Sequence, residues 1–117
     1  NVSERIITEN ISAAAKFGAC ETVIPSQDTI AVSEDGIRIT GIPERKKMYN
    51  VQTPQSFRLD LILKAHEVWI EKGGEDATDD ASLLLSSGHD VYIVNGEKNN
   101  LKITTGEDLR ILYSVTE

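Results

Sequence analysis

The stretch that decides the fold is Gly18-Ala19-Cys20-Glu21-Thr22-Val23-Ile24-Pro25, a short apolar strand that directly follows a helical pattern. Upstream, Ser3 is placed to cap a helix, and apolar residues recur at helical spacing as far as Phe17. Gly18 supplies the helix stop, and Pro25 ends the strand. A helix leading directly into a buried strand is typical of an α/β layered sheet.

The same alternation continues in the second half of the chain. A helical pattern from Leu59 to Ile70 stops at Gly73-Gly74, and a shorter helix capped by Thr78 or Asp79 runs to Gly88. The apolar run 91–94 is typical of a strand buried in a parallel sheet. We therefore expect a Rossmann-like, mostly parallel sheet with helices on both faces.

Two overlapping capping boxes open the last expected helix, which covers residues 109–115. Thr104 is followed three residues later by Glu107, and Thr105 by Asp108. Lys102 lies between these capping boxes and the turn that precedes them.

Residues 28–51, called the arm from here on, interrupt this alternation. Residues 29–33 and 37–40 flank Glu34-Asp35-Gly36, and Asp-Gly between alternating residues is a strong hairpin signal. We expect a β-hairpin that protrudes from the domain. Because an isolated two-stranded hairpin is marginal in water, it should lean on the rest of the domain or on a second subunit.

Bulk composition narrows the class of protein. The 117 residues suffice for one domain or part of one, and the net charge of −7 argues against a nucleic-acid binder. The sequence has no apolar run near the ~20 residues of a membrane span.

Cys20 is the single cysteine, so no disulfide can form within the chain, which suits a cytoplasmic location. We expect the Cys20 thiol to be packed in the interior. The chain begins at Asn1, as expected of a trimmed chain or of a piece of a larger protein.

Gln52-Thr53-Pro54-Gln55 gathers two amides and a hydroxyl around a proline. Neutral donors and acceptors on an extended segment suit the hydroxyl groups of a polyol, and Pro54 disfavours helix at Thr53. The alternative is a well-formed helix start with Ser56 as N-cap. Thr78-Asp79-Asp80-Ala81-Ser82 likewise has two interpretations, helix capping and contact of Thr78 with a substrate.

Two cations stand out in this acidic chain. Lys102 lies between a turn and a capped helix; alternation sets it on the face opposite Leu101 and Ile103, and in α/β sheets ligands gather beyond the carboxyl ends of strands. Arg45 opens the basic cluster Arg45-Lys46-Lys47, and arginine suits bidentate phosphate recognition. The alternative for the cluster is a solvated face. His66 and His89 have no second metal ligand at usable spacing, so we expect structural roles.

Three strings taken together resemble one enzyme family: residues 52–57, residues 78–82 and Asn100-Leu101-Lys102-Ile103-Thr104. Their order and spacing are similar to the carboxyl-terminal half of the cytidylyltransferases that activate sugar-alcohol phosphates with CTP. These are the 2-C-methyl-D-erythritol 4-phosphate enzymes and their ribitol-5-phosphate relatives. The resemblance covers nearly the whole chain, so it implies that residues 1–117 are the carboxyl-terminal part of a single nucleotidyltransferase domain.

The resemblance also implies roles for individual residues. Lys102 and Arg45 would act on the acceptor phosphate as catalytic cations, and Thr29, Thr53 and Thr78 would bind the substrate. In the family, arms such as residues 28–51 reach across a homodimer to complete the neighbouring site. The Gly-rich loop that holds CTP and the aspartate that holds a divalent metal, usually Mg²⁺, belong to the family's other half. We therefore expect no cofactor or metal site in this chain and no turnover of CTP by these 117 residues alone.

The sequence leaves two choices open. Gly18-Ala19-Cys20-Glu21-Thr22-Val23-Ile24-Pro25 and Ile42-Pro43-Glu44-Arg45 look more like the ribitol-phosphate enzymes, whereas residues 78–82 and 102–105 look more like the methylerythritol enzymes. We favour methylerythritol phosphate, because the residues nearest the expected pocket follow that branch. A non-catalytic oligomerisation module is the alternative from another class, although a scaffold has no need of all five site residues.

Overall fold

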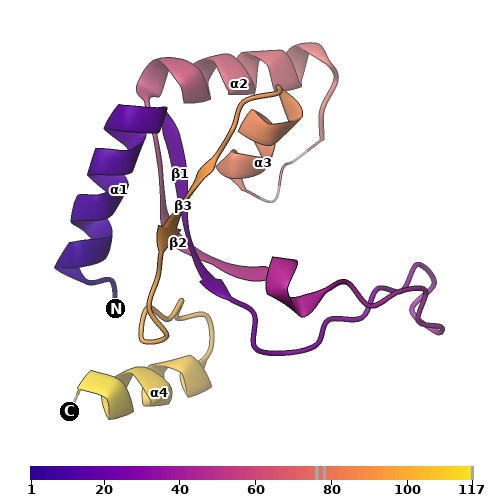
Figure 1. The fold of residues 1–117 in the computed structure, drawn as a ribbon, viewed down its shortest axis with the longest axis vertical. Helices are drawn as coiled ribbons and strands as arrows, with labels where there is room; N and C mark the ends of the chain where they lie inside the picture. The colour runs from indigo at the N-terminus through magenta and orange to yellow at the C-terminus, as the bar shows by residue number, and fades with distance from the viewer. Residues whose placement is uncertain (76, 78, 117) are drawn as a thin grey trace.

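The computed structural model describes residues 1–75, 77 and 79–116 (Figure 1). Helices and strands alternate along the chain, as expected for an α/β protein. In order, they are α1 (Glu4–Phe17), β1 (Ala19–Pro25), the 3-10 turn η1 (Arg45–Lys47), β2 (Tyr49–Phe57), α2 (Leu59–Glu71), α3 (Asp80–Ser86), β3 (Tyr92–Asn95) and α4 (Gly106–Thr116).

Helix α1 has the two ends that the sequence predicts. The Ser3 side chain accepts a hydrogen bond from the Ile6 N–H, and the Gly18 N–H donates to the Ala14 carbonyl at 2.8 Å. Gly18 has a φ of +90°, and a Cβ there would also collide with the Leu61 side chain. Glycine is therefore required at this junction both for its backbone conformation and for close packing.

The sheet has three strands in the order β2-β1-β3. β1 pairs with β3 in parallel and with β2 in antiparallel orientation. The α/β class is confirmed, but the sheet is mixed rather than mostly parallel, because β2 returns directly from the arm alongside β1.

Helices cover both faces of the sheet, as expected. Ala19 and Cys20 are both fully buried and, as neighbours in a strand, point to opposite faces. Ala19 packs with Ala65 of α2 and Leu84 of α3, whereas Cys20 packs with α1 and β3. Figure 1 shows α1 on one side of the strands and the α2–α3 pair on the other. Cys20 is thus the packed thiol that we expected, and burial raises its pKa.

Strand β2 is the element that sequence analysis missed. Six of its nine residues are polar or proline (Asn50, Gln52, Thr53, Pro54, Gln55 and Ser56), so it lacks the apolar alternation of a strand. Ser56 is not a helix N-cap: it lies within β2, opposite Cys20, and α2 begins after Arg58 without a side-chain cap. The Thr53–Pro54 peptide is cis, and the β1–β2 register shifts between Glu21 and Val23, beside this bond.

The arm protrudes, but it is not the regular hairpin that we expected. Its last residues, 49–51, belong to β2, and between residues 28 and 48 the structure forms a single bridge, Val32 with Gly41. All residues from 29 to 42 are exposed, with Ile37 and Ile39 at 87% and 66%, so neither face of the expected hairpin is buried. Without a third layer to cover these side chains, a regular ladder has little to stabilise it.

Strand β3 lies where the sequence predicts, but at the edge of the sheet. Val94 is buried, whereas Ile93 is 55% exposed, so the expectation of a strand buried on both faces is wrong. After it, the Thr105–Asp108 capping box forms as predicted: Asp108 N–H donates to Thr105 Oγ1, and the Asp108 carboxylate accepts from the Thr105 N–H. Ile103 is also exposed, so Lys102 lies in an irregular loop rather than on an alternating strand end.

The start of α3 shows which of the two expected residues, Thr78 or Asp79, caps this helix. Asp79 is its N-cap, because its carboxylate accepts from the Ser82 N–H at 3.0 Å. Thr78, the other capping candidate and an expected substrate-binding residue, lies outside the described residues. Within the described part of the chain, no helix has the length and apolar character needed to cross a bilayer.

Candidate functional site

Residues 52–55, called the 52–55 segment, bring the three sequence strings together. Gln52 donates to the Glu97 carbonyl at 2.9 Å and accepts from the Asn100 amide at 3.3 Å. At the other end of the segment, Gln55 donates to the Asp79 carboxylate at 3.3 Å. The segment therefore touches both the loop that precedes Lys102 and the start of α3, which are far apart in the sequence.

Lys102 is held near Thr53 through Asn100. The Asn100 amide donates to the Thr53 carbonyl at 2.6 Å, and Asn100 is only 8% exposed. Lys102, two residues further on, is exposed to solvent. Asn100 thus ties the loop that carries Lys102 to the Thr53 carbonyl, and the lysine is accessible to an anion.

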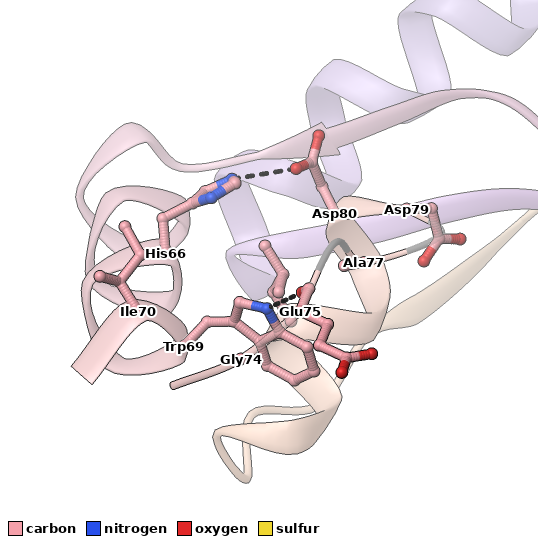
Figure 2. A pocket seen from close by; sticks show the side chains of 9 residues that line it. His66, Trp69, Ile70, Gly74, Glu75, Ala77, Asp79 and Asp80 are labelled. Carbon is pink, nitrogen blue, oxygen red and sulfur yellow. Dashed lines mark hydrogen bonds and ion pairs between the residues drawn. The ribbon is translucent and has the colours of Figure 1, made fainter. Parts of the chain in front are cut away.

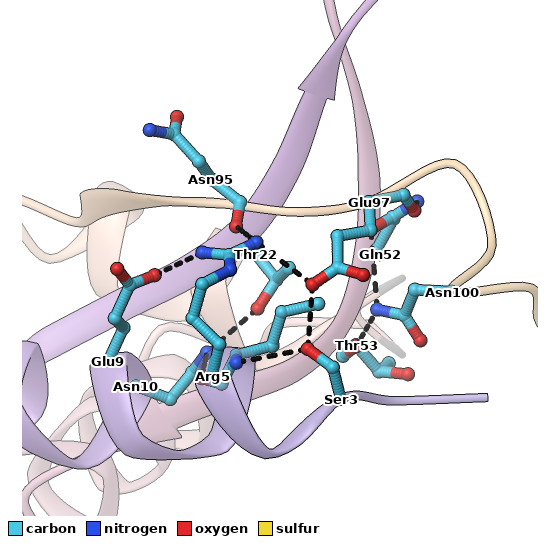
Figure 3. A network of polar contacts seen from close by, with 11 residues as sticks. Ser3, Arg5, Glu9, Asn10, Thr22, Gln52, Thr53, Asn95, Glu97 and Asn100 are labelled. Carbon is cyan, nitrogen blue, oxygen red and sulfur yellow. Dashed lines mark hydrogen bonds and ion pairs between the residues drawn. The ribbon is translucent and has the colours of Figure 1, made fainter.

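Gly96 permits this contact. A Cβ at this position would collide with the Gln52 side-chain amide, so only glycine allows the loop after β3 to approach the 52–55 segment this closely. The loop is fixed from its other side as well. The Glu97 carboxylate accepts from Ser3 Oγ at 2.7 Å and from Arg5 at 3.1 Å, and these bonds lower its pKa (Figure 3).

A buried polar network supports the 52–55 segment from the α1 side (Figure 3). Asn10 of α1, which is 1% exposed, donates to Thr22 Oγ1 at 2.9 Å and accepts from Ser56 Oγ at 2.9 Å. Thr22 in turn donates to the Pro54 carbonyl at 2.7 Å. Because each buried polar atom here has a partner, the network fixes the position of the Thr53–Pro54 bond relative to α1.

Sequence reasoning missed Asn10, although a signal was present. Asn10 lies four residues after Ile6 and four before Ala14, both of which are buried. A polar residue on the buried stripe of a helix must find a partner inside the protein, so its position marks a buried network.

A carboxyl pair lies on the opposite side of the 52–55 segment. Burial, and then hydrogen bonding and repulsion from Asp79, raise the pKa of Glu21 to about 7. Hydrogen bonds from Ser82 are the main cause that lowers the pKa of Asp79, and hydrogen bonds from Glu21 and Gln55 add to it. The two carboxyls therefore take different protonation states near neutral pH. Sequence reasoning gave no role to Glu21, because only the fold brings it to α3.

Arg45 and Thr29, the other two expected site residues, lie elsewhere in this chain. Arg45 makes one long contact, 3.5 Å, to the Gln27 carbonyl at the base of the arm, and both site residues are exposed. From Tyr49 to Thr53, β2 alone covers about 13 Å at about 3.3 Å per residue, and Arg45 lies four residues further back. Arg45 thus contacts the base of the arm, whereas Thr53 contacts Asn100 in the loop that precedes Lys102.

A pocket of about 330 Å³ lies between α2 and α3 (Figure 2). His66 lines it and pairs with Asp80 at 3.0 Å, and Trp69 donates to the Glu75 carbonyl. His66 thus links the two helices, in keeping with a structural role. Across the described residues, no three His, Cys, Asp or Glu side chains are grouped so that they could hold a metal ion.

Comparison with known proteins gives consistent matches over nearly the whole chain. The family model for IspD, 2-C-methyl-D-erythritol 4-phosphate cytidylyltransferase, matches residues 2–115. The chain is 44% identical to the 2-C-methyl-D-erythritol 4-phosphate cytidylyltransferase of Alkaliphilus oremlandii, over 97% of this chain and 48% of that protein. It is 40% identical to the protein of the same name from Thermosipho melanesiensis, over 95% of this chain and 48% of the relative.

Solved structures agree. The 2-C-methyl-D-erythritol 4-phosphate cytidylyltransferase of Thermus thermophilus superposes with a TM-score of 0.83 at 34% identity, over 97% of this chain and 55% of that one. The 4-diphosphocytidyl-2C-methyl-D-erythritol synthase of Anaerococcus prevotii gives a TM-score of 0.87 at 32% identity, over 99% and 54%. The chain spans about half the length of these relatives. That this half is the carboxyl-terminal one is not confirmed by the matches.

Proposed function

Because the chain belongs to the 2-C-methyl-D-erythritol 4-phosphate cytidylyltransferase family, we propose that the full-length protein transfers the cytidylyl group of CTP to 2-C-methyl-D-erythritol 4-phosphate. An oxygen of the acceptor phosphate forms a bond to the α-phosphorus of CTP, and the bond from that phosphorus to pyrophosphate breaks. Residues 1–117 supply the binding site for the acceptor phosphate. The observation that carries this proposal is the convergence of the three family strings on the 52–55 segment.

In this proposal the chain's own residues bind and orient the acceptor. The Lys102 ammonium neutralises charge on the acceptor phosphate, and the Thr53 hydroxyl donates to the acceptor. Thr78 contributes a second hydroxyl at the start of α3. Phosphoryl-type transfers depend mainly on positioning and on charge neutralisation, so cations and hydroxyls suffice on the acceptor side.

The rest of the full-length protein would hold CTP and the divalent metal. In the part of this chain that the structure describes, no group of three acidic or imidazole side chains fits a metal ion, so we assign Mg²⁺ to the rest of the protein. When bound, Mg²⁺ would neutralise charge on the CTP phosphates.

The arm would complete the acceptor site of a second subunit. Arg45 contacts the Gln27 carbonyl at the base of the arm rather than the Thr53 region, and the exposed Ile37 and Ile39 leave the arm without a covering layer. A homodimer clasped through residues 28–51 accounts for both observations. The arm of one subunit would cover its apolar side chains against the partner and present Arg45 to the partner's acceptor phosphate.

Pyrophosphate release tests the proposed reaction. Full-length protein with CTP and Mg²⁺ should release pyrophosphate when 2-C-methyl-D-erythritol 4-phosphate is added, and far less with ribitol 5-phosphate. The 117 residues alone, tested in parallel, should release none. Faster release with ribitol 5-phosphate would replace the proposed acceptor, and no release with either would reject the reaction.

A further inference from the structure

Glu21 lies beside the 52–55 segment and has a buried side-chain oxygen without a hydrogen-bond partner. It is on β1, directly opposite Gln55 of β2, and on the same side of the sheet as Ala19, which packs against α2 and α3. Its Oε1 atom is buried and accepts no hydrogen bond. A buried carboxylate oxygen without a donor is costly, so the neutral form of Glu21 is favoured.

The nearest group that can satisfy Glu21 is another carboxyl. Asp79 already accepts from the Ser82 N–H, from Ser82 Oγ and from Gln55. Those donors keep Asp79 ionised, and an ionised carboxylate only accepts hydrogen bonds. A hydrogen bond between Glu21 and Asp79 therefore requires a proton on Glu21.

We propose that Glu21 is a positioning residue, whose protonated carboxyl donates to Asp79 and holds the start of α3 against the 52–55 segment. This inference rests on the proposed function, because the start of α3 follows Thr78 directly and Gln55 lies two residues from Thr53. When Glu21 loses its proton, two like charges face each other and the hydrogen bond is lost. The acceptor then binds more weakly, while the CTP side of the site is unaffected.

The surroundings of Glu21 place this change near neutral pH. The pKa of Glu21 is raised to about 7, by burial first and by Asp79 second. Among the described residues, the charged group that acts on Glu21 is Asp79, the N-cap of α3, while β2 contributes the neutral Gln55 opposite Glu21. The first residue of α3, Asp80, is paired with His66 of α2. Cys20 points to the other face.

The test compares full-length wild type with Glu21→Gln, which keeps a hydrogen-bond donor and removes the titration. Between about pH 6 and about pH 8.5, the wild-type KM for 2-C-methyl-D-erythritol 4-phosphate should rise by about threefold to tenfold more than that of Glu21→Gln. The acceptor phosphate titrates in both proteins, so the difference between the two profiles isolates Glu21. Glu71→Gln, at the exposed end of α2, is the matched control and should follow wild type. Parallel KM profiles for wild type and Glu21→Gln would overturn the proposal.

A second readout separates this inference from the proposed reaction. Because the folded state raises the Glu21 pKa above the ordinary value of 4.5, wild-type stability should fall relative to Glu21→Gln as pH rises from about 4.5 to about 7, and then level off. Thermal unfolding of both proteins measures this directly, whether or not the acceptor reacts. A constant difference in Tm across that range would show that Glu21 does not share a proton with Asp79.

Discussion

The 52–55 segment and the arm are adjacent in the sequence, yet different forces hold them. Buried hydrogen bonds fix the segment on two sides, through Asn10 and Asn100. In the arm, a single bridge and local turn contacts hold a chain whose isoleucines are exposed. One subunit therefore fixes only part of the proposed site. In the proposed homodimer, the remaining part lies on the arm, whose exposed isoleucines the second subunit covers.

Among the substitutions considered, loss of the Asn10 side chain should destabilise the protein most, because Asn10 helps to hold the 52–55 segment. Asn10→Ala deletes the bonds to the buried Thr22 and the half-buried Ser56, so the free energy of unfolding of the full-length protein should fall by about 2–4 kcal/mol. Urea unfolding measures this. Ser12→Ala, on the exposed side of α1, is the matched control. A loss no larger than that of the control would show that the network does not hold the segment.

Lys102→Ala tests the proposed role of this lysine in binding the acceptor phosphate. Loss of a charge-assisted contact should raise the KM for the acceptor by about tenfold to a hundredfold, with the KM for CTP nearly unchanged. Steady-state kinetics of the full-length enzyme, with Lys64→Ala on α2 as the control, checks this. Equal weakening of CTP binding would mean that Lys102 has been assigned to the wrong substrate.

Replacing one glycine in each region tests whether the 52–55 segment is more tightly packed than the arm. Gly96→Ala brings a methyl group into the Gln52 amide and should destabilise the protein by about 1–3 kcal/mol. Gly41→Ala, in the arm, meets nothing within 4 Å and should change stability by less than about 0.5 kcal/mol. Urea unfolding of both variants gives the difference. Equal losses would contradict the distinction between a packed segment and an uncovered arm.

The smallest effect is expected at the tip of the arm. Asp35 accepts from the N–H groups of Ile37 and Arg38, which lower its pKa to about 2, but the side chain is exposed to water. Asp35→Ala should therefore shift Tm by about 1 °C or less. A drop in Tm as large as that of Asn10→Ala would show that the arm's turn is a main source of stability.

Much of this fold could be predicted because the signals are local. The ends of α1, the strand after Gly18 and the Thr105–Asp108 capping box follow from a few neighbouring residues. β2 could not be predicted, since its polar side chains are matched by partners that only the folded chain supplies. The strands expected at residues 29–33 and 37–40 failed for the opposite reason: the strand pattern is present, but nothing in the described part of the chain covers these residues.

The candidate site likewise contains some residues that local sequence signals predict and others that only the folded chain brings together. Thr53 and Lys102 were predicted from the family strings, and in the structure Asn100 links the loop that carries Lys102 to the Thr53 carbonyl. Asn10 had a periodic signal that could have been used, whereas the approach of Glu21 to Asp79 depends on how β1 faces α3. Long-range pairs of this kind cannot be derived from spacing along a single sequence.

Mixed dimers of two impaired variants, assayed at an acceptor concentration below the KM, test whether the arm of one subunit completes the acceptor site of another. Full-length Arg45→Ala and Lys102→Ala subunits, co-expressed in equal amounts, should form mixed dimers with one intact site each. Pyrophosphate release should then recover to about a quarter of wild type, because half of the dimers are mixed and each has one working site of two. Activity no greater than that of the two parent variants would contradict the claim.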